Sequence, residues 1–198
     1  MSIKNPLLLD LPMPITTPRL TIRPMMPGDG KQVFEAIDES RKILSQWYDW
    51  VAGAKTWKDG ECMARQFYAN FILRKDFSCV IFREEKLIGI CGYHSPNWGI
   101  PSAAIGYWCR VSEQGKGYMC EAIAALTLYA FQQVGFRRLT ISCDDENIKS
   151  AAIPETLGFT LETKSKGLIP KPGTKELRLC RRYVRFDAQG LEEWNVKW

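Results

Sequence analysis

The segment from Ala103 to Cys143 constrains the fold more than any other part of the chain. Its residues predict a strand over Ala103–Val111 and, after a glycine-bearing turn, a long helix over Tyr118–Val134. A second β-rich run, Phe136–Cys143, follows that helix directly. A strand, a glycine-rich turn, a helix and a strand in this order indicate a mixed α and β fold with this unit at its centre.

The residues before this unit predict one strand, two helices and a hairpin. Thr17–Met25 alternates and is rich in β-branched residues, whereas the sequence after Asp29 has helical spacing that continues through ILSQWYDWV. Thr56 is suited to cap a second helix. Phe77–Phe82 and Lys86–Tyr93 flank a charged turn, which predicts a hairpin, and the segment SPNWGIPS after it reads as a loop.

After the central unit, the sequence predicts a short helix and two closing strands. The helix extends to Leu157 and ends at Gly158, and it should begin near Ser150, because Pro154 is tolerated in a first turn. The segments FTLETKS and KELRLCRRYVRF predict antiparallel strands. The 198 residues therefore fit a single domain, 1–198.

Composition narrows the class of protein. The net charge is +5 and no basic run is long, so nucleic acid is not an expected partner. Seven scattered cysteines without a CxxC pair indicate reduced thiols in the cytoplasm, and with His94 as the single histidine they predict no metal site. The N-terminal apolar run is broken by Asp10, Pro12 and Pro14, which predicts neither a signal peptide nor a membrane span.

The turn Gln114–Met119 carries the strongest chemical signal. A glycine-rich turn that opens a helix leaves several backbone N–H groups pointing outward, and the helix dipole adds positive potential there. Gly115 and Gly117 let an anion such as a pyrophosphate approach the backbone, and Lys116 adds a charge. The turn matches neither a P-loop nor a dinucleotide fingerprint. A tight strand-to-helix turn without a ligand is the alternative interpretation.

The sequence also resembles a known superfamily. IGYWCRVSEQGKGYMCEA is similar to the cofactor motif of GNAT acetyltransferases, [QR]xxGx[GA] after a strand, and Asn147 and Ser150 followed by ETLGF are similar to its second signature. TPRLTIRP, LSQWYDWV and LIGICGYHSPNW resemble the branch of ribosomal-protein serine and alanine N-acetyltransferases. The resemblance covers about residues 15–187 and leaves a tail over 188–198. Helix capping is the alternative role for both Asn147 and Ser150.

The resemblance implies a three-layer α+β fold: a twisted, mostly antiparallel mixed sheet of about seven strands, splayed in the middle, with helices on both faces. It implies acetyl-CoA as cosubstrate and no metal, with pantetheine lying in the splay and pairing with backbone groups of Cys109 and Val111. The pyrophosphate would sit on the amides of Gln114–Met119, where the bulky Met119 can point away. The implied cofactor-binding residues are Trp108, Cys109, Arg110, Val111, Gln114, Gly115, Lys116, Gly117, Tyr118, Met119, Asn147 and Ser150.

Acetyl transfer to an amine needs a proton acceptor, a donor for the oxyanion and support for the departing thiolate. The N–H of Cys109 is the candidate oxyanion donor, and Ser150 matches a family position proposed to protonate the thiolate. Relatives often carry a glutamate where this chain has Ala104, so the general base stays open. The alternatives are Glu121, His94, Asp144, Asp145 or a chain of water. Glu121 could equally be an acid favoured by the helix dipole, and His94 an ordinary loop histidine.

The resemblance implies an N-acetyltransferase that moves acetyl directly to a primary amine, on a protein N-terminus or a small molecule. Candidates for the acceptor wall are Trp47, Trp50, Tyr93 and Trp98, although aromatic residues are more often part of a core. A sensor that binds acyl-CoA without turnover is a second hypothesis, which Ala104 favours. We expect a cytoplasmic monomer or homodimer.

Overall fold

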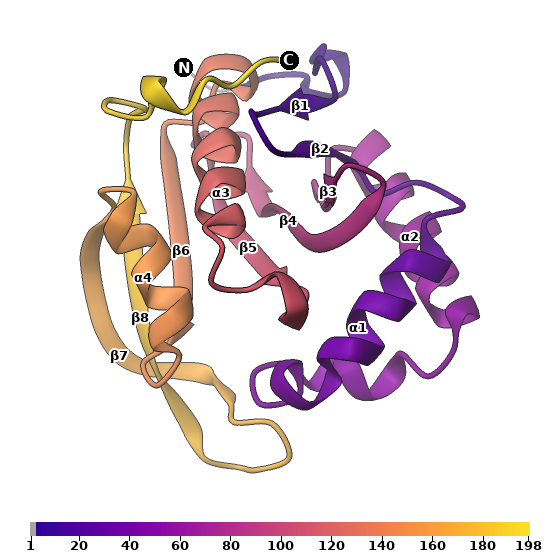
Figure 1. Cartoon of the computed structure of the whole chain (residues 1–198). Helices are drawn as coiled ribbons and strands as arrows, with labels where there is room; N and C mark the ends of the chain where they lie inside the picture. Colours follow the sequence, from indigo (N-terminus) through magenta and orange to yellow (C-terminus); the bar gives the residue numbers. More distant parts are fainter. Residues whose placement is uncertain (1–2) are drawn as a thin grey trace.

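The strands of residues 3–198, the part of the chain that this computed structural model describes, form one eight-stranded sheet (Figure 1). Its order is β1-β2-β3-β4-β5-β6-β8-β7; β5 and β6 run parallel and the other neighbours antiparallel. The strands are β1 (Ile15–Thr16), β2 (Thr21–Pro24), β3 (Cys79–Arg83), β4 (Lys86–Asn97), β5 (Ser102–Cys109), β6 (Arg138–Asp144), β7 (Thr160–Pro170) and β8 (Leu177–Arg185). The expected sheet is confirmed with one strand more, because β1 is too short to leave an alternating pattern in the sequence.

Helices lie on both faces of the sheet, as expected. The longer ones are α1 (Gly30–Leu44), α2 (Trp57–Ile72), α3 (Tyr118–Tyr129) and α4 (Ile148–Thr156), and the short turns are η1 (Pro6–Leu8), η2 (Asp49–Gly53), η3 (Val111–Glu113), η4 (Ala130–Val134) and η5 (Glu192–Trp194). The α1 and α2 face is packed around Val80 and Trp108, and the α3 face around Ile105 and Leu139. Figure 1 shows α3 and α4 in front of the strands, with β1 and the C-terminal segment at one end of the molecule and the β7–β8 hairpin tip at the other. Within residues 3–198, no helix has the length and apolarity to cross a membrane.

The long helix α3 lies at the centre of the core. Every residue from Glu121 to Tyr129 is buried, because the sheet, β1 and η5 all contact this helix. The helix continues into the π turn η4 and ends at Gly135, whose φ of 84° is left-handed. With its sides covered, α3 can present only its N-terminal end to a ligand.

The sheet opens between its two parallel strands. β5 and β6 pair as far as Ile105 and Ile141, and pairing stops there although β5 continues to Cys109 and β6 to Asp144. Beyond these positions the two backbone edges face each other without a hydrogen-bond ladder. This opening, the β5–β6 gap, confirms the expected splay.

Two of the expected boundaries differ on the α1 side. α1 ends at Leu44 instead of continuing, because Tyr48 takes an extended conformation with φ −134° and ψ 118° and directs its hydroxyl to β5. β4 also runs as far as Asn97, through residues that the sequence predicts as a loop. Thr56 caps α2 as expected, in a capping box with Asp59.

The start of α4 also differs from the prediction. The helix begins at Ile148, so Pro154 lies inside it rather than in its first turn. Proline has no N–H, which leaves the carbonyl of Ser150 without its helical donor. The Tyr107 hydroxyl donates to that carbonyl instead, at 2.8 Å. The hydroxyl of Tyr107, on β5, therefore supplies the hydrogen bond that Pro154 cannot. This bond lets α4 begin at Ile148 with the proline in its interior.

Candidate functional site

The glycine turn Gln114–Met119 opens α3 with the amides of residues 115–119 uncapped, whereas the Gln114 amide donates to the Val111 carbonyl at 3.3 Å, contrary to expectation. Gly115 (φ 75°) and Gly117 (φ 79°) take the left-handed conformation, which glycine adopts without strain. Gly117 is the N-cap of α3, and among residues 3–198 no side chain caps this end. Met119 buries its side chain beside Gly89, as expected of a bulky residue here. The amides and the positive end of the dipole are therefore available to an anion.

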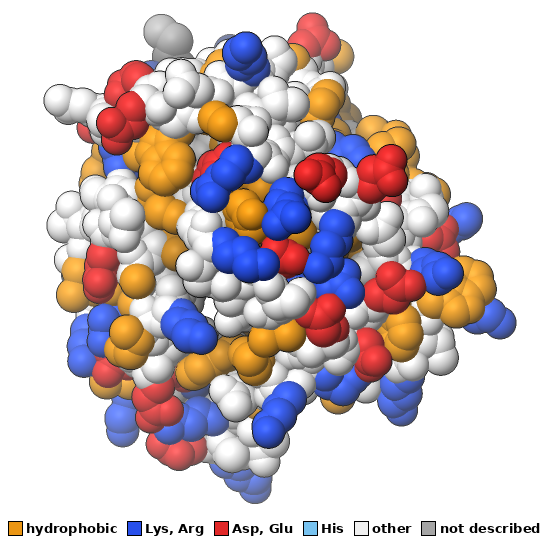
Figure 2. Space-filling model, in the orientation of Figure 1, with side chains coloured by type: hydrophobic (Ala, Val, Ile, Leu, Met, Phe, Trp, Pro, Cys, Tyr) orange, Lys and Arg blue, Asp and Glu red, His pale blue; other side chains and the backbone are white. Residues whose placement is uncertain are grey.

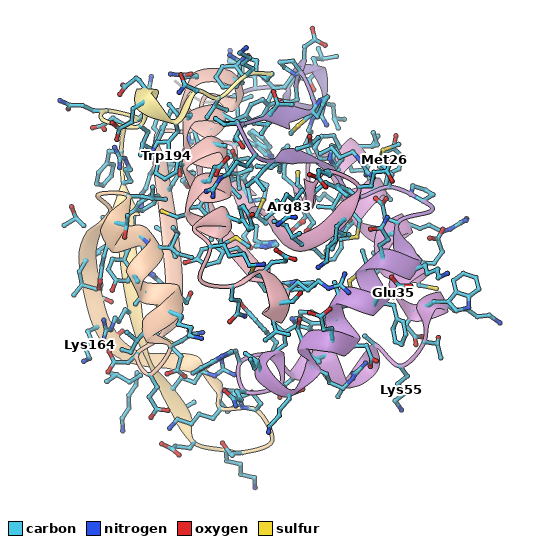
Figure 3. All side chains as sticks on the ribbon, viewed as in Figure 1. Met26, Glu35, Lys55, Arg83, Lys164 and Trp194 are labelled. Carbon is cyan, nitrogen blue, oxygen red and sulfur yellow. The ribbon has the colours of Figure 1, made fainter. Side chains whose placement is uncertain are left out.

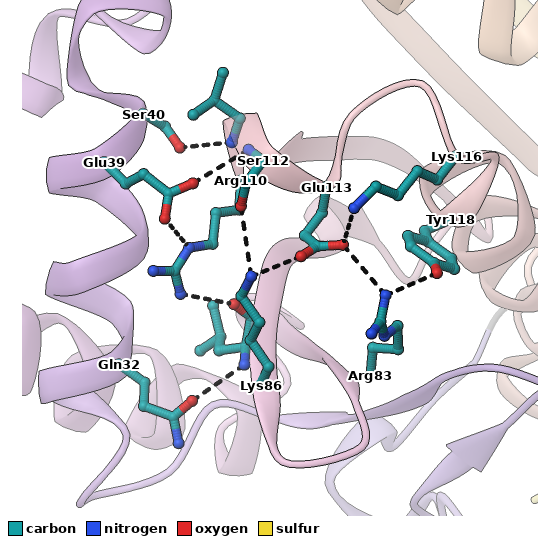
Figure 4. Close-up of polar contacts among 12 residues, drawn as sticks. Gln32, Glu39, Ser40, Arg83, Lys86, Arg110, Ser112, Glu113, Lys116 and Tyr118 are labelled. Carbon is teal, nitrogen blue, oxygen red and sulfur yellow. Dashed lines mark hydrogen bonds and ion pairs between the residues drawn. The ribbon is translucent and has the colours of Figure 1, made fainter.

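A buried carboxylate gathers three cations beside this turn (Figure 4). Glu113 is 4% exposed, and its oxygens lie 2.6 Å from Lys86 Nζ and 2.9 Å from Lys116 Nζ. Arg83 follows at 3.6 Å. Hydrogen bonds from Lys86 and Lys116 lower the pKa of Glu113 to about 2. One negative charge among three positive ones leaves this surface positive.

The same charge pattern is visible on the surface. Figure 2 shows basic side chains around an acidic one, over the beginning of α3. Figure 3 labels Arg83 in that part of the molecule, beside α3. Its guanidinium also donates to the Tyr118 hydroxyl at 3.0 Å. The basic surface thus lies directly at the open end of the helix.

Arg19 joins the N-terminal loop to the glycine turn. Its guanidinium lies 2.5 Å from Glu121 and donates to the carbonyl of Lys116 at 3.2 Å. It also lies 4.7 Å from the centre of the Tyr118 ring. Glu121, 3% exposed, accepts from Thr17 Oγ1 at 2.6 Å as well. Both carboxylate oxygens are thereby occupied, so Glu121 holds the loop in place and offers no free oxygen to an amine.

Cys109 turns its backbone amide toward the β5–β6 gap. The next amide, that of Arg110, donates to Ile88 of β4 at 2.7 Å, and hydrogen-bond directions alternate along a strand. The amide of Cys109 therefore points away from β4. Its carbonyl accepts from Gln114 Nε2 at 3.2 Å, which ties the strand end to the glycine turn. Burial raises the pKa of the Cys109 thiol to about 11, so the sulfur is a protonated, poor nucleophile at neutral pH.

The neighbours of Cys109 differ from the expected cofactor contacts. The N–H of Val111 donates to Ser40 Oγ of α1 at 2.9 Å, so this amide already has a partner within the chain, and the expected pairing of the Val111 backbone with pantetheine stays a prediction. The Arg110 guanidinium lies 2.5 Å from Glu39, and the Trp108 ring packs in the core on the α1 face. Cys109 thus remains as the residue of this segment with a backbone donor on the gap.

α4 brings Ser150 to the same opening. Asn147 caps this helix, because its side-chain oxygen accepts from the Ser150 amide at 3.1 Å, and the capping interpretation of Asn147 is confirmed. The Ser150 hydroxyl donates to the Tyr107 hydroxyl oxygen at 3.3 Å. Burial raises the pKa of Tyr107, so that hydroxyl stays protonated. Ser150 therefore faces β5, with its amide used for capping and its hydroxyl within reach of the gap.

His94 lies on the sheet face that carries α1 and α2, paired in register with Ala104. Its Nδ1 is 2.5 Å from Asp76, whose other oxygen accepts from the hydroxyl and amide of Ser78. Burial acts against ionisation of Asp76, yet hydrogen bonds from His94 and Ser78 lower its pKa. A Cβ at Gly106 would meet His94 Nε2 at 2.6 Å, so the ring lies over that glycine. The imidazole of His94, oriented by Asp76, therefore lies beside Ala104, the position at which relatives often carry a glutamate.

Two of the aromatic candidates for an acceptor wall belong to the core. Tyr93 is 1% exposed and donates to the carbonyl of Leu126 in α3. Trp98 stacks on Phe136 at 5.3 Å between ring centres, in the same cluster. Both side chains pack with α3 on the face opposite His94, so the expectation that they line an acceptor pocket is wrong.

The turn after α1 carries the aromatic residues near the gap. The Tyr48 hydroxyl donates to the carbonyl of Tyr107 at 3.1 Å. The Trp50 ring lies 5.7 Å from Tyr48 and 6.4 Å from Trp108, between centres, while Trp47 is half-buried in the same turn. Sequence reasoning misses Tyr48, because a helix continuing through this segment gives it another direction.

The charged partners at the site also escape the sequence analysis. Arg83, Lys86 and Glu113 belong to different elements and meet only in the folded chain. Asp76 and Ser78 form a local turn signal of the Asp-x-Ser kind, but nothing local connects Asp76 to a histidine eighteen positions later. These residues could be found only from the strand pairing.

Comparisons with known proteins agree with this geometry. The family described as acetyltransferase (GNAT) domain matches residues 19–160. The Bacillus subtilis protein YdaF is 27% identical over 150 residues, which cover 74% of this chain and 81% of that protein. The ribosomal-protein-serine acetyltransferase of Escherichia coli is 29% identical over 139 residues, covering 67% and 74%. A solved structure of RimL, a ribosomal L7/L12 alpha-N-protein acetyltransferase in complex with coenzyme A, matches with a TM-score of 0.82 at 21% identity and covers 90% of this chain and 98% of that chain.

Proposed function

The chain belongs to the acetyltransferase (GNAT) family, whose cosubstrate is acetyl-CoA, and we propose that it acetylates the primary amine at the N-terminus of a protein in the cytoplasm. The ribosomal-protein-serine acetyltransferase among its relatives supports a protein acceptor. One observation carries the proposal: the β5–β6 gap has the Cys109 amide and Ser150 at its edges and His94 beside it. A donor, a hydroxyl and a base thus surround one opening.

The residues at the glycine turn fit coenzyme A. The free amides of the turn, those of residues 115–119, would hold the diphosphate, with Lys116 and Arg19 adding positive charge. The Cys109 amide would bind along the pantetheine arm or meet the charge that develops on the acetyl oxygen. When bound, the cosubstrate supplies the acetyl thioester, and this chain supplies orientation and proton transfer.

His94 is the group that we assign to the amine proton. Ala104 offers no carboxylate, whereas Asp76 accepts from Nδ1 of the imidazole and leaves Nε2 as the proton acceptor. On the other side of the gap, the Ser150 hydroxyl can donate to the departing sulfur. Glu121 is assigned a positioning role, because its oxygens are bound by Arg19 and Thr17.

The test is a comparison of matched peptides. Peptides that begin with a free serine or alanine are incubated with acetyl-CoA, beside the same peptides with a blocked N-terminus and an internal lysine. Thiol release and mass spectrometry should locate one acetyl group on the free N-terminus. Acetylation of the blocked peptide at lysine, or of small amines alone, would overturn the choice of acceptor.

A module that binds acyl-CoA without turnover is the second candidate, and Ala104 is the observation that favours it. Thermal stabilisation by acetyl-CoA, together with no thiol release for any amine or peptide, would select this alternative. Turnover with any amine excludes it.

A further inference from the structure

The sheet face that carries His94 holds a groove of about 320 Å³ over β5, β6 and β8. Hydroxyl and guanidinium groups line it, and its lining includes no carboxylate. The residues that matter are Ser102, Ala104, Arg138, Thr140, Ser142 and Arg182. The groove begins where β5 and β6 separate, because Ala104 pairs with Thr140 one step before the last paired residues.

The charges of the groove do not balance. Arg138 is neutralised by Glu162 at 2.8 Å. Asp144, further along β6, lies 3.8 Å from Arg178. Arg182 is exposed and forms no ion pair with any residue of 3–198. The groove therefore contains one guanidinium whose charge nothing in the described chain compensates.

The strand register gives the approximate distance between Arg182 and the place where an acceptor amine would lie. Arg182 is paired with Ser142, so it stands one strand beyond β6, whereas His94 Nε2 lies over Gly106 of β5. Two strand spacings of about 4.8 Å set a separation of at least roughly 10 Å, because β5 and β6 are no longer paired at this level. An extended peptide advances about 3.3 Å per residue, so its third or fourth residue would reach the guanidinium when the N-terminal amine is beside His94.

Resting on the proposed function, we propose that the groove selects acceptor peptides with an acidic side chain at the third or fourth residue, which pairs with Arg182. Thr140 and Ser142 supply neutral hydrogen-bond partners along the way. A basic side chain at those positions would meet the uncompensated charge of Arg182 and be rejected.

The test is a position scan with peptides of one parent sequence that begins with serine. A single aspartate is moved from the second to the sixth position, and each peptide is compared with its asparagine counterpart. We expect kcat/KM to rise about tenfold for aspartate at the third or fourth position, equivalent to about 1.4 kcal/mol. Arg182→Gln should abolish the rise, and Arg182→Glu should shift the preference to lysine at the same positions. Lys166→Gln, which removes an exposed cation of β7 outside the groove lining, should leave the preference intact.

A binding measurement separates this inference from the proposed function. Peptides labelled at the C-terminus are titrated with protein and CoA, and anisotropy reports binding without turnover. Selective binding of the acidic peptide that is lost in Arg182→Gln supports the groove even where no acetyl group is transferred. Turnover with equal preference for aspartate and asparagine, or a preference that survives in Arg182→Gln, overturns the inference and leaves the acetyltransferase proposal standing.

Discussion

The two sides of the β5–β6 gap are built from different parts of the chain. At the glycine turn, the groups offered to a ligand are backbone amides, and most charged side chains nearby are already paired, as Glu113 is with Lys86 and Lys116. On the opposite face, the groups on offer are side chains, His94 and Arg182. The glycine turn therefore depends on backbone conformation, whereas the opposite face depends on the identity of its side chains. Different substitutions should abolish cosubstrate binding at the first and acceptor chemistry at the second.

The largest expected effect is on the backbone side. Gly117→Glu places a Cβ at a φ of 79° and a carboxylate where a diphosphate would lie, so we expect acetyl-CoA binding to fall below detection at millimolar ligand. Calorimetry measures this directly. Gly173→Glu is the matched control, because Gly173 has a φ of 70° in the turn between β7 and β8, away from α3. Normal affinity in Gly117→Glu would refute the placement of the diphosphate.

The next effect tests the side-chain face. His94→Gln removes the proton acceptor and leaves the glycine turn intact, so kcat should fall about 100-fold with little change in acetyl-CoA affinity. Asp76→Asn should give a smaller loss, because the imidazole stays but loses its charged partner. Steady-state kinetics with peptide and acetyl-CoA measure both quantities, and an unchanged kcat in His94→Gln would assign the base to another group or to water.

A smaller effect is expected at Ser150, which lies between the two sides. Ser150→Ala keeps the backbone amide that Asn147 caps and removes the hydroxyl, so kcat should fall about tenfold while stability changes little. Asn147→Ala is the contrasting variant: it removes the cap and should cost about 1 kcal/mol of unfolding free energy. Equal losses of kcat and stability in Ser150→Ala would mean that the hydroxyl serves packing alone.

The smallest effect is a dependence of stability on pH at the paired carboxylate. The pKa of Glu113 in the folded protein is about 2, below its ordinary value of 4.5, so the unfolded chain takes up the proton first. The contribution of Glu113 is therefore complete above pH 4.5 and decreases as the pH falls toward 2. In Glu113→Gln, the melting temperature should change less with pH between 4.5 and 2 than in the unsubstituted protein. The substitution Glu35→Gln, at an exposed position, should leave the pH dependence as it is.

The glycine turn could be predicted from the sequence, whereas the face with His94 could not. The glycine turn is one continuous stretch, so its glycines, its helix start and its open amides are readable without a fold. The pairing of His94 with Asp76 depends on the register of two strands, and sequence patterns do not fix that register. The bond from the Val111 amide to Ser40 cannot be read from local sequence, because Ser40 lies seventy-one positions away on α1. Tyr48 was missed because α1 ends before it.

Pro154 couples its own helix, α4, to the strand β5. Because it lacks an N–H, α4 has one carbonyl to spare, and Tyr107 of β5 binds it. An alanine there would supply the missing helical donor, and the carbonyl of Ser150 would no longer depend on Tyr107 for a partner. The need for this bond between α4 and β5 therefore arises from a hydrogen atom that the imino acid does not have.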